Sequence, residues 1–232
     1  MEVLWLGEDE VKDLLTMDEA IAAVKEAFYD HGIGRTQMPP KSYLNFAPYE
    51  GDLRTMPAYL ERVDQAGVKI VNVHPRNAAI GLPTVMALLT LVSPKTGAPL
   101  AIMGATHLTA MRTGAAGAVA ARHLAREESQ TAGMIGAGVQ ARAQLLGLSR
   151  LFKLDQVRIF DLSLERCQGL ADYGRVILNG EFIIEMKAED ACQCDFLVNT
   201  TPARSPVVRD DWILPGTHIN AIGADARGKQ EL

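Results

Sequence analysis

Hydrophobic and polar positions follow two different periods along this chain of 232 residues. In the first thirty residues apolar side chains recur every three or four positions, which is typical of helices. We expect one short helix from Glu8 and a second that is capped by Asp18 and ends near Gly32. From residue 39 to about residue 100, short apolar segments alternate with turn residues instead. This pattern predicts strands at 41–46, 54–59, 66–73, 84–92 and 99–103.

The second half of the chain changes period twice. Residues 106–125 form a long helical pattern whose alanines and glycines indicate close packing against a neighbour. The polar stretch 126–130 is the expected domain boundary. Beyond it strand, glycine loop, helix and strand follow one another, with strands expected at 131–135, 156–160, 182–185, 196–199 and 218–222 and a helix at 139–152.

These patterns predict an α/β protein of two domains. Successive strands without helices between them indicate an antiparallel or mixed sheet, so we expect an α+β domain over residues 1–128. Strands that alternate with helices indicate a parallel sheet. We therefore expect a Rossmann-type dinucleotide-binding domain over residues 129–232.

Composition narrows the class of protein. Hydrophobic residues make up 48% and charged residues 22%, and the net charge of −5 disfavours nucleic acid as a partner. No apolar stretch approaches the roughly 20 residues that cross a bilayer, and the N-terminus lacks the order of a signal peptide. Three cysteines, an odd count, suit a reducing compartment. Cys192 and Cys194 lack a second pair at zinc spacing, so we expect buried thiols and no metal. The expectation is a soluble cytoplasmic protein.

The glycine loop Gly136-Ala137-Gly138-Val139-Gln140-Ala141 lies between a predicted strand and a predicted helix. In this context Gly136 permits a tight turn, and Gly138 lets the backbone approach a pyrophosphate at the helix N-terminus. Asp161 follows Ala141 by 20 residues at the end of the next strand, where its carboxylate can take ribose hydroxyls. We therefore predict bound NAD. An acid there, with no arginine directly after it, favours NAD over NADP.

Three cations stand in otherwise apolar segments. Arg54 and Lys69 lie within predicted strands, and Arg112 lies within the alanine-rich helix. A buried cation requires an anion from the protein or from a ligand. Hydride transfer to an amino or imino acid needs such groups, because the substrate carboxylate must be held and the reacting carbon polarised.

Several ordered blocks of sequence resemble one family. These blocks are Met38-Pro39-Pro40-Lys41, Leu53-Arg54-Thr55-Met56-Pro57, Lys69-Ile70-Val71-Asn72-Val73-His74-Pro75, Gly81-Leu82-Pro83-Thr84-Val85-Met86-Ala87, Leu108-Thr109-Ala110-Met111-Arg112-Thr113-Gly114-Ala115-Ala116, and His218-Ile219-Asn220-Ala221-Ile222-Gly223-Ala224-Asp225 followed by Gly228-Lys229. On these blocks the chain is similar to the ornithine cyclodeaminase/μ-crystallin family, and within it to archaeal-type alanine dehydrogenases.

The resemblance implies roles for individual residues. The first domain would bind a small amino or keto acid and form a homodimer, and members of the family continue well beyond Leu232. Lys69 and Asp225 are expected to be catalytic. Substrate-binding residues would be Lys41, Arg54, Lys69 and Arg112. Residues that bind NAD would be Thr84, Arg112, Thr113, Gly136, Gly138, Val139, Gln140, Asp161, Thr201, Ile222, Gly223, Ala224 and Lys229.

Arg54 indicates which reaction to expect. Ornithine cyclodeaminases carry a glutamate there, whereas archaeal-type alanine dehydrogenases carry arginine. A guanidinium repels the ammonium groups of ornithine and offers a fork to a carboxylate. The leading interpretation is an NAD-dependent alanine dehydrogenase or related imino-acid reductase. The alternatives are an ornithine cyclodeaminase that uses NAD catalytically and a non-catalytic NAD(H)-binding protein.

Overall fold

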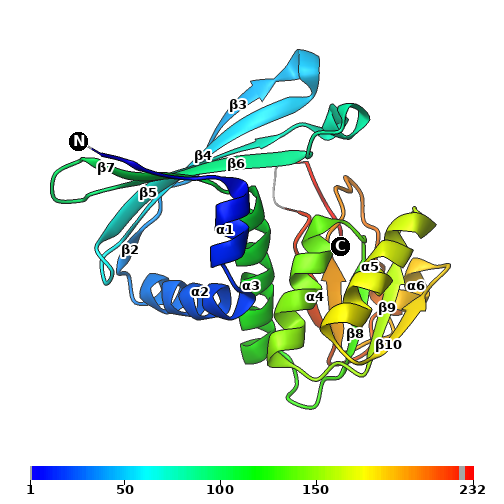
Figure 1. The fold of residues 1–232 in the computed structure, drawn as a ribbon. Coiled ribbons are helices and arrows are strands. Elements are labelled where there is room, and N and C mark those ends of the chain that lie inside the picture. The colour runs from blue at the N-terminus through cyan, green and yellow to red at the C-terminus, as the bar shows by residue number, and fades with distance from the viewer. Residues whose placement is uncertain (1, 225–227) are drawn as a thin grey trace. The chain divides into compact units, whose positions relative to one another are not determined.

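The computed structural model describes residues 2–224 and 228–232. The chain divides into two compact units, Met1–Thr109 and Ala110–Leu232. Figure 1 shows a twisted, largely antiparallel sheet in the first unit and a parallel sheet with helices in the second. The mixed α/β fold class expected from the sequence is confirmed. The domain limits at residue 128 and the roles of the two domains stay predictions.

The sheet of the first unit has the strand order β1-β7-β6-β5-β4-β2, and β3 pairs with β4 beside this path. All pairs are antiparallel except β1 with β7. The strand β1 was not predicted, because only helices were expected in the first thirty residues. The strands are β1 (Leu4–Leu6), β2 (Thr36–Gln37), β3 (Ser42–Phe46), β4 (Gly51–Leu60), β5 (Gln65–Val73), β6 (Val85–Val92) and β7 (Pro99–Gly104).

The helices of this unit are α1 (Glu8–Leu14), α2 (Met17–Gly32) and the start of α3 (Thr106–Leu124). Capping of α2 by Asp18 was a wrong prediction. The N-cap is Thr16, whose hydroxyl accepts from the amide of Glu19 while Glu19 Oε2 accepts from the amide of Thr16. This reciprocal pair satisfies two amide groups, which a single aspartate two residues later cannot do.

The second unit contains a five-stranded parallel sheet in the order β10-β9-β8-β11-β12. The order reverses between β8 and β11, and ligands bind at such a point in open α/β sheets. The elements are β8 (Thr131–Ile135), α4 (Val139–Leu151), β9 (Gln156–Phe160), α5 (Leu164–Ile177), β10 (Glu181–Ile184), α6 (Ala188–Ala191), β11 (Phe196–Asn199) and β12 (His218–Ala221). The pattern of apolar residues did not predict the helix α5.

Alternating residues of the central strands enter two apolar cores. Met134 and Val198 pack with α4 and α5, whereas Ile135 and Leu197 pack with α6 on the opposite face. α3 and α4 approach closely, since a Cβ at Gly114 would collide with the backbone of Ala143. The close packing expected from the glycines is therefore present. Within the described residues, no helix combines the length and apolar character needed to span a bilayer.

Candidate dinucleotide and substrate sites

The glycine loop follows β8 directly and leads into α4. Gly136 has φ +93°, which a residue with a side chain rarely adopts, and its amide donates to the carbonyl of Phe160 at 2.8 Å. Gly138 is the N-cap of α4, and open space lies where its Cβ would be. The backbone at Gly138 is therefore open to close approach by an anionic group at the N-terminus of α4.

The first turn of α4 supports the same conclusion. Ala141 is fully buried against the sheet, as its small side chain predicted, and Val139 is exposed. Gln140 Oε1 is buried, and it has no hydrogen-bond partner among the described residues. Buried acceptors are normally hydrogen-bonded, so Gln140 Oε1 is available to a donor on a bound molecule or to a water.

Asp161, one residue beyond β9, joins this loop. Its Oδ2 accepts from the amide of Ala137 at 2.9 Å and its Oδ1 accepts from the amide of Ser163 at 2.9 Å. The carboxylate is thus fixed between the glycine loop and the start of α5. A cavity of about 520 Å³ opens beside it. The residues that line it are Ile135, Gly136, Phe160, Asp161, Leu162, Ser163, Arg166, Thr201, Pro202, Ala203 and Val207.

Arg166 was not expected at this cavity. The residue directly after Asp161 is the uncharged Leu162, whereas the first turn of α5 brings Arg166 to the same cavity. The spacing of five residues from a strand-end acid into a helix is the signal that would have found it.

The loops after β11 and β12 bring together four residues that the resemblance assigned to the cofactor. The amides of Ile222 and Gly223 donate to the carbonyl of Asn199, and Thr201 and Ala224 lie in the same two loops. Asp225, expected to be catalytic, lies outside the described residues. Lys229 is half-buried. Glu231, which the sequence analysis did not single out, is 1% exposed and contacts both loops.

The first unit carries the predicted cations on one face of its sheet. Arg54 opposes Val71, and Lys69 opposes Met56, so all four side chains share a face. Arg54 is 5% exposed and Lys69 is 8% exposed. Diagonal neighbours of this kind have Cα atoms about 7–8 Å apart, so both cations can reach one small anion.

Two neighbours shape the surroundings of Arg54. Asp52 accepts from Nε and Nη2 of Arg54, each at 2.9 Å. The ring of Tyr43 lies 5.5 Å from the guanidinium carbon of Arg54 and 5.9 Å from Nζ of Lys41. The structure therefore brings Lys41 and Arg54 to one aromatic ring. Neither Asp52 nor Tyr43 was identified from the sequence.

The remaining predicted residues lie at other places in their own units. Thr84 precedes β6 and is exposed, and its carbonyl accepts from the amide of His74 at 2.8 Å. Arg112 is exposed on α3. The carbonyl of Thr113 accepts from Nε2 of the fully buried Gln144 at 2.7 Å, which fixes this turn of α3 within the second unit.

Comparison with known proteins identifies close relatives. Residues 2–232 match the ornithine cyclodeaminase/mu-crystallin family. The chain is 51% identical to the alanine dehydrogenase of Archaeoglobus fulgidus, over 100% of this chain and 70% of the relative. A solved archaeal alanine dehydrogenase dimer with bound NAD has a TM-score of 0.95 and 50% identity, and the match covers 100% of this chain and 71% of that chain.

A second solved structure is similarly close in fold. The Δ1-pyrroline-2-carboxylate reductase of Thermococcus litoralis, in complex with NADH and L-proline, has a TM-score of 0.96 and 38% identity. The match covers 99% of this chain and 72% of that chain. Both neighbours were solved with a nicotinamide dinucleotide, the group that the glycine loop, Asp161 and the cavity beside them fit.

Proposed function

Because this chain belongs to the ornithine cyclodeaminase/mu-crystallin family, we propose that it is an NAD-dependent oxidoreductase of small amino and imino acids, acting as an alanine dehydrogenase. The reaction would join pyruvate and ammonium, with consumption of NADH and a proton, to give alanine, NAD⁺ and water. The observation that carries this proposal is the pair of buried cations, Arg54 and Lys69, on one sheet face.

Residues of the second unit would hold the pyrophosphate and the adenosine of the dinucleotide. The glycine loop and the N-terminus of α4 would take the pyrophosphate, and Asp161 would take the adenosine ribose. NADH supplies a hydride when it is bound. Thr84, Arg112, Thr113, Val139, Gln140, Thr201, Ile222, Gly223, Ala224 and Lys229 are the further positions that we assign to cofactor contact.

The cations of the first unit would hold and polarise the substrate. Arg54 and Lys41 would bind the carboxylate, because a guanidinium forms paired, charge-assisted hydrogen bonds with this group. From the family resemblance we assign Arg112, a residue of the second unit, to the same carboxylate. Lys69 would donate to the carbonyl oxygen or imine nitrogen and so draw electrons from the reacting carbon. From the family resemblance we assign proton transfer, and activation of ammonia or water, to Asp225.

The choice of substrate follows from charge. Ornithine brings two ammonium groups, and Arg54 would repel them at this face. A cyclic imine that carries a carboxylate suits the same cations, and the Thermococcus litoralis reductase is 38% identical. Reduction of Δ1-pyrroline-2-carboxylate is therefore the second candidate.

The test follows NADH absorbance on addition of pyruvate, ammonium or both. Oxidation of NADH that requires both substrates is the expected result. Oxidation with Δ1-pyrroline-2-carboxylate and none with pyruvate and ammonium would replace the alanine assignment by the second candidate. Proline formed from ornithine without net change in NADH would make the protein a cyclodeaminase and overturn both.

The oligomeric state and the cellular location complete the proposal. The archaeal relative is a dimer, so we propose a homodimer for this chain, which light scattering after gel filtration would check. All three cysteines are buried thiols in the structure, which suits the reducing cytoplasm that we propose as the location.

A further inference from the structure

The carboxylate of Glu231 connects the two loops that follow β11 and β12. Oε1 accepts from the amide of Thr201 at 2.6 Å and from its hydroxyl at 2.8 Å. Oε2 accepts from the amide of Gly223 at 2.6 Å and from that of Ala224 at 3.1 Å. Each oxygen therefore serves one loop, and four donors converge on one buried side chain.

The backbone of Glu231 is itself fixed. Its carbonyl accepts from the amides of Val207 and Val208, and the amide of Gln230 donates to the carbonyl of Ala203 at 3.0 Å. At Gly223, a Cβ would collide with Glu231 Oε1 and with the carbonyl of Thr201. Such close approach means that the spacing of the two loops depends directly on where this carboxylate lies.

Both loops leave the carboxyl ends of neighbouring parallel strands, the edge at which open α/β sheets bind ligands. We propose that Glu231 is a positioning residue, which sets the spacing of these loops and thereby the cofactor contacts of Thr201, Gly223 and Ala224. The inference rests on the proposed NAD-binding function. It requires two acceptor oxygens, since an amide in place of the carboxylate would turn an NH₂ group toward N–H donors.

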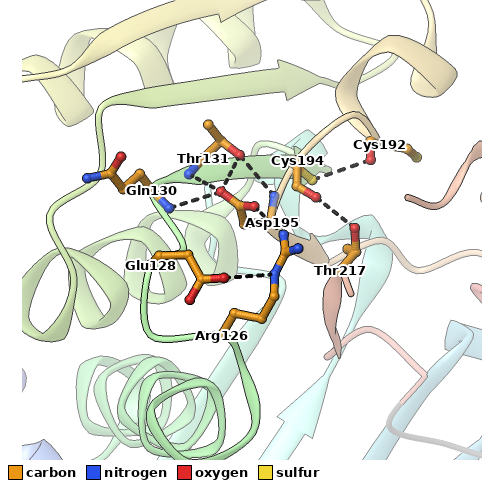
Figure 2. A network of polar contacts seen from close by, with 8 residues as sticks. All are labelled: Arg126, Glu128, Gln130, Thr131, Cys192, Cys194, Asp195 and Thr217. Atoms are coloured by element: carbon orange, nitrogen blue, oxygen red, sulfur yellow. Dashed lines mark hydrogen bonds and ion pairs between the residues drawn. The ribbon is translucent and has the colours of Figure 1, made fainter. Parts of the chain in front are cut away.

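Asp195 provides a matched control at the other end of β11. Its carboxylate accepts from the amides of Gln130 and Thr131, from the Thr131 hydroxyl at 2.8 Å and from Arg126 Nη2 at 2.7 Å (Figure 2). Asp195 and Glu231 are thus carboxylates with four donors each. Asp195, however, is the residue before β11, at the amino ends of the strands, away from the cofactor loops.

The experiment compares Glu231→Gln with Asp195→Asn. Hydrogen exchange, measured by mass spectrometry without NADH, should rise in peptides that contain Thr201 and Gly223 for Glu231→Gln. For Asp195→Asn it should rise in the peptide that contains Gln130 and Thr131. NADH titration, followed by its fluorescence, should show about ten-fold weaker binding for Glu231→Gln, with binding by Asp195→Asn unchanged.

Two outcomes would overturn the inference. One is hydrogen exchange that stays unchanged in both loops of Glu231→Gln. The other is NADH binding that weakens equally in the two variants, when each is assayed at the same number of degrees below its own melting temperature. If Glu231→Gln does not fold, Glu231→Asp decides, because it keeps the charge but shortens the reach by one methylene, and the same changes are expected. Neither readout needs a substrate, so failure of pyruvate reduction would refute the reaction and leave this inference standing.

Discussion

The carboxylate of Asp52 accepts two parallel hydrogen bonds from the guanidinium of Arg54, from Nε to Oδ1 and from Nη2 to Oδ2, each 2.9 Å long. Arg54 has 6% of its side chain exposed and Asp52 has 21%. A planar guanidinium that is held along one edge has its remaining edge fixed in direction. Asp52 thus compensates a buried charge and also orients the group that we assign to the substrate carboxylate.

Arg54→Lys should therefore weaken substrate binding while keeping the charge. Lysine cannot reproduce a fork, and loss of one charge-assisted hydrogen bond costs about 1.5–3 kcal/mol, or about 10- to 100-fold. We expect the KM for pyruvate to rise by this factor, with NADH binding unchanged. Steady-state kinetics at saturating NADH and ammonium would measure it.

Arg209→Lys is the control for this substitution. Arg209 forms the same paired contact with Asp211, two residues away, at 3.0 Å for each bond. Both side chains are more than half exposed, however, and exposed ion pairs contribute little. A KM for pyruvate that is unchanged in both variants would remove Arg54 from the substrate site.

Asp161→Ser should shift cofactor preference toward NADPH. The carboxylate repels a 2′-phosphate, and its removal leaves Arg166 at the same cavity. We expect the ratio of KM for NADPH to KM for NADH to fall by about ten-fold or more. In the double variant Asp161→Ser with Arg166→Ala this gain should disappear. A gain of equal size in the double variant would show that Arg166 plays no part.

Two glycines of one loop should respond differently to alanine. Gly136→Ala forces a side chain into φ +93° and against Thr200 Oγ1, so we expect a loss of about 1–3 kcal/mol in the free energy of unfolding. Gly138→Ala places its Cβ in open space, so the melting temperature should stay unchanged while NADH binds more weakly. Equal NADH affinity in wild type and Gly138→Ala would contradict the placement of the pyrophosphate.

Local patterns were sufficient to predict most elements of this fold. The period of apolar residues located the strands, and the glycine loop with Asp161 located the cavity that we assign to the dinucleotide, because these signals lie within about 25 residues of one another. The Thr16–Glu19 capping box is also a local pattern, and it predicts the N-cap of α2 correctly, whereas Asp18 does not.

Contacts between distant residues could not be predicted in this way. Glu8 accepts from the amide of Thr106, 98 residues further along the chain, and so caps α3. Glu231 accepts a hydrogen bond from the amide of Thr201, which lies 30 residues away in sequence. Arg62 donates to the buried Asp30, which lies 32 residues away. A carboxylate in an ordinary polar stretch does not indicate its partner, since folding alone brings the two together.

Asp195 should make stability depend on pH in the acid range. Burial raises the pKa of this carboxyl group, but hydrogen bonds from Gln130 and Thr131 and the charge of Arg126 outweigh burial and lower the pKa below its ordinary value of 3.8. Folding therefore favours the ionised form. The stabilisation is complete above pH 3.8 and is lost as the pH falls from there through the lower pKa of the folded state.

Asp195→Asn removes this dependence and provides the measurement. Unfolding by urea at a series of pH values should show wild type more stable than the variant by about 1–3 kcal/mol near neutral pH, the contribution of hydrogen bonds to a charged group. The difference should shrink below pH 3.8. Glu8 and Glu19 also have lowered pKa values, but their effects cancel in the comparison because both proteins contain them. A difference that stayed constant down to pH 2 would mean that Asp195 contributes through its shape and not through its charge.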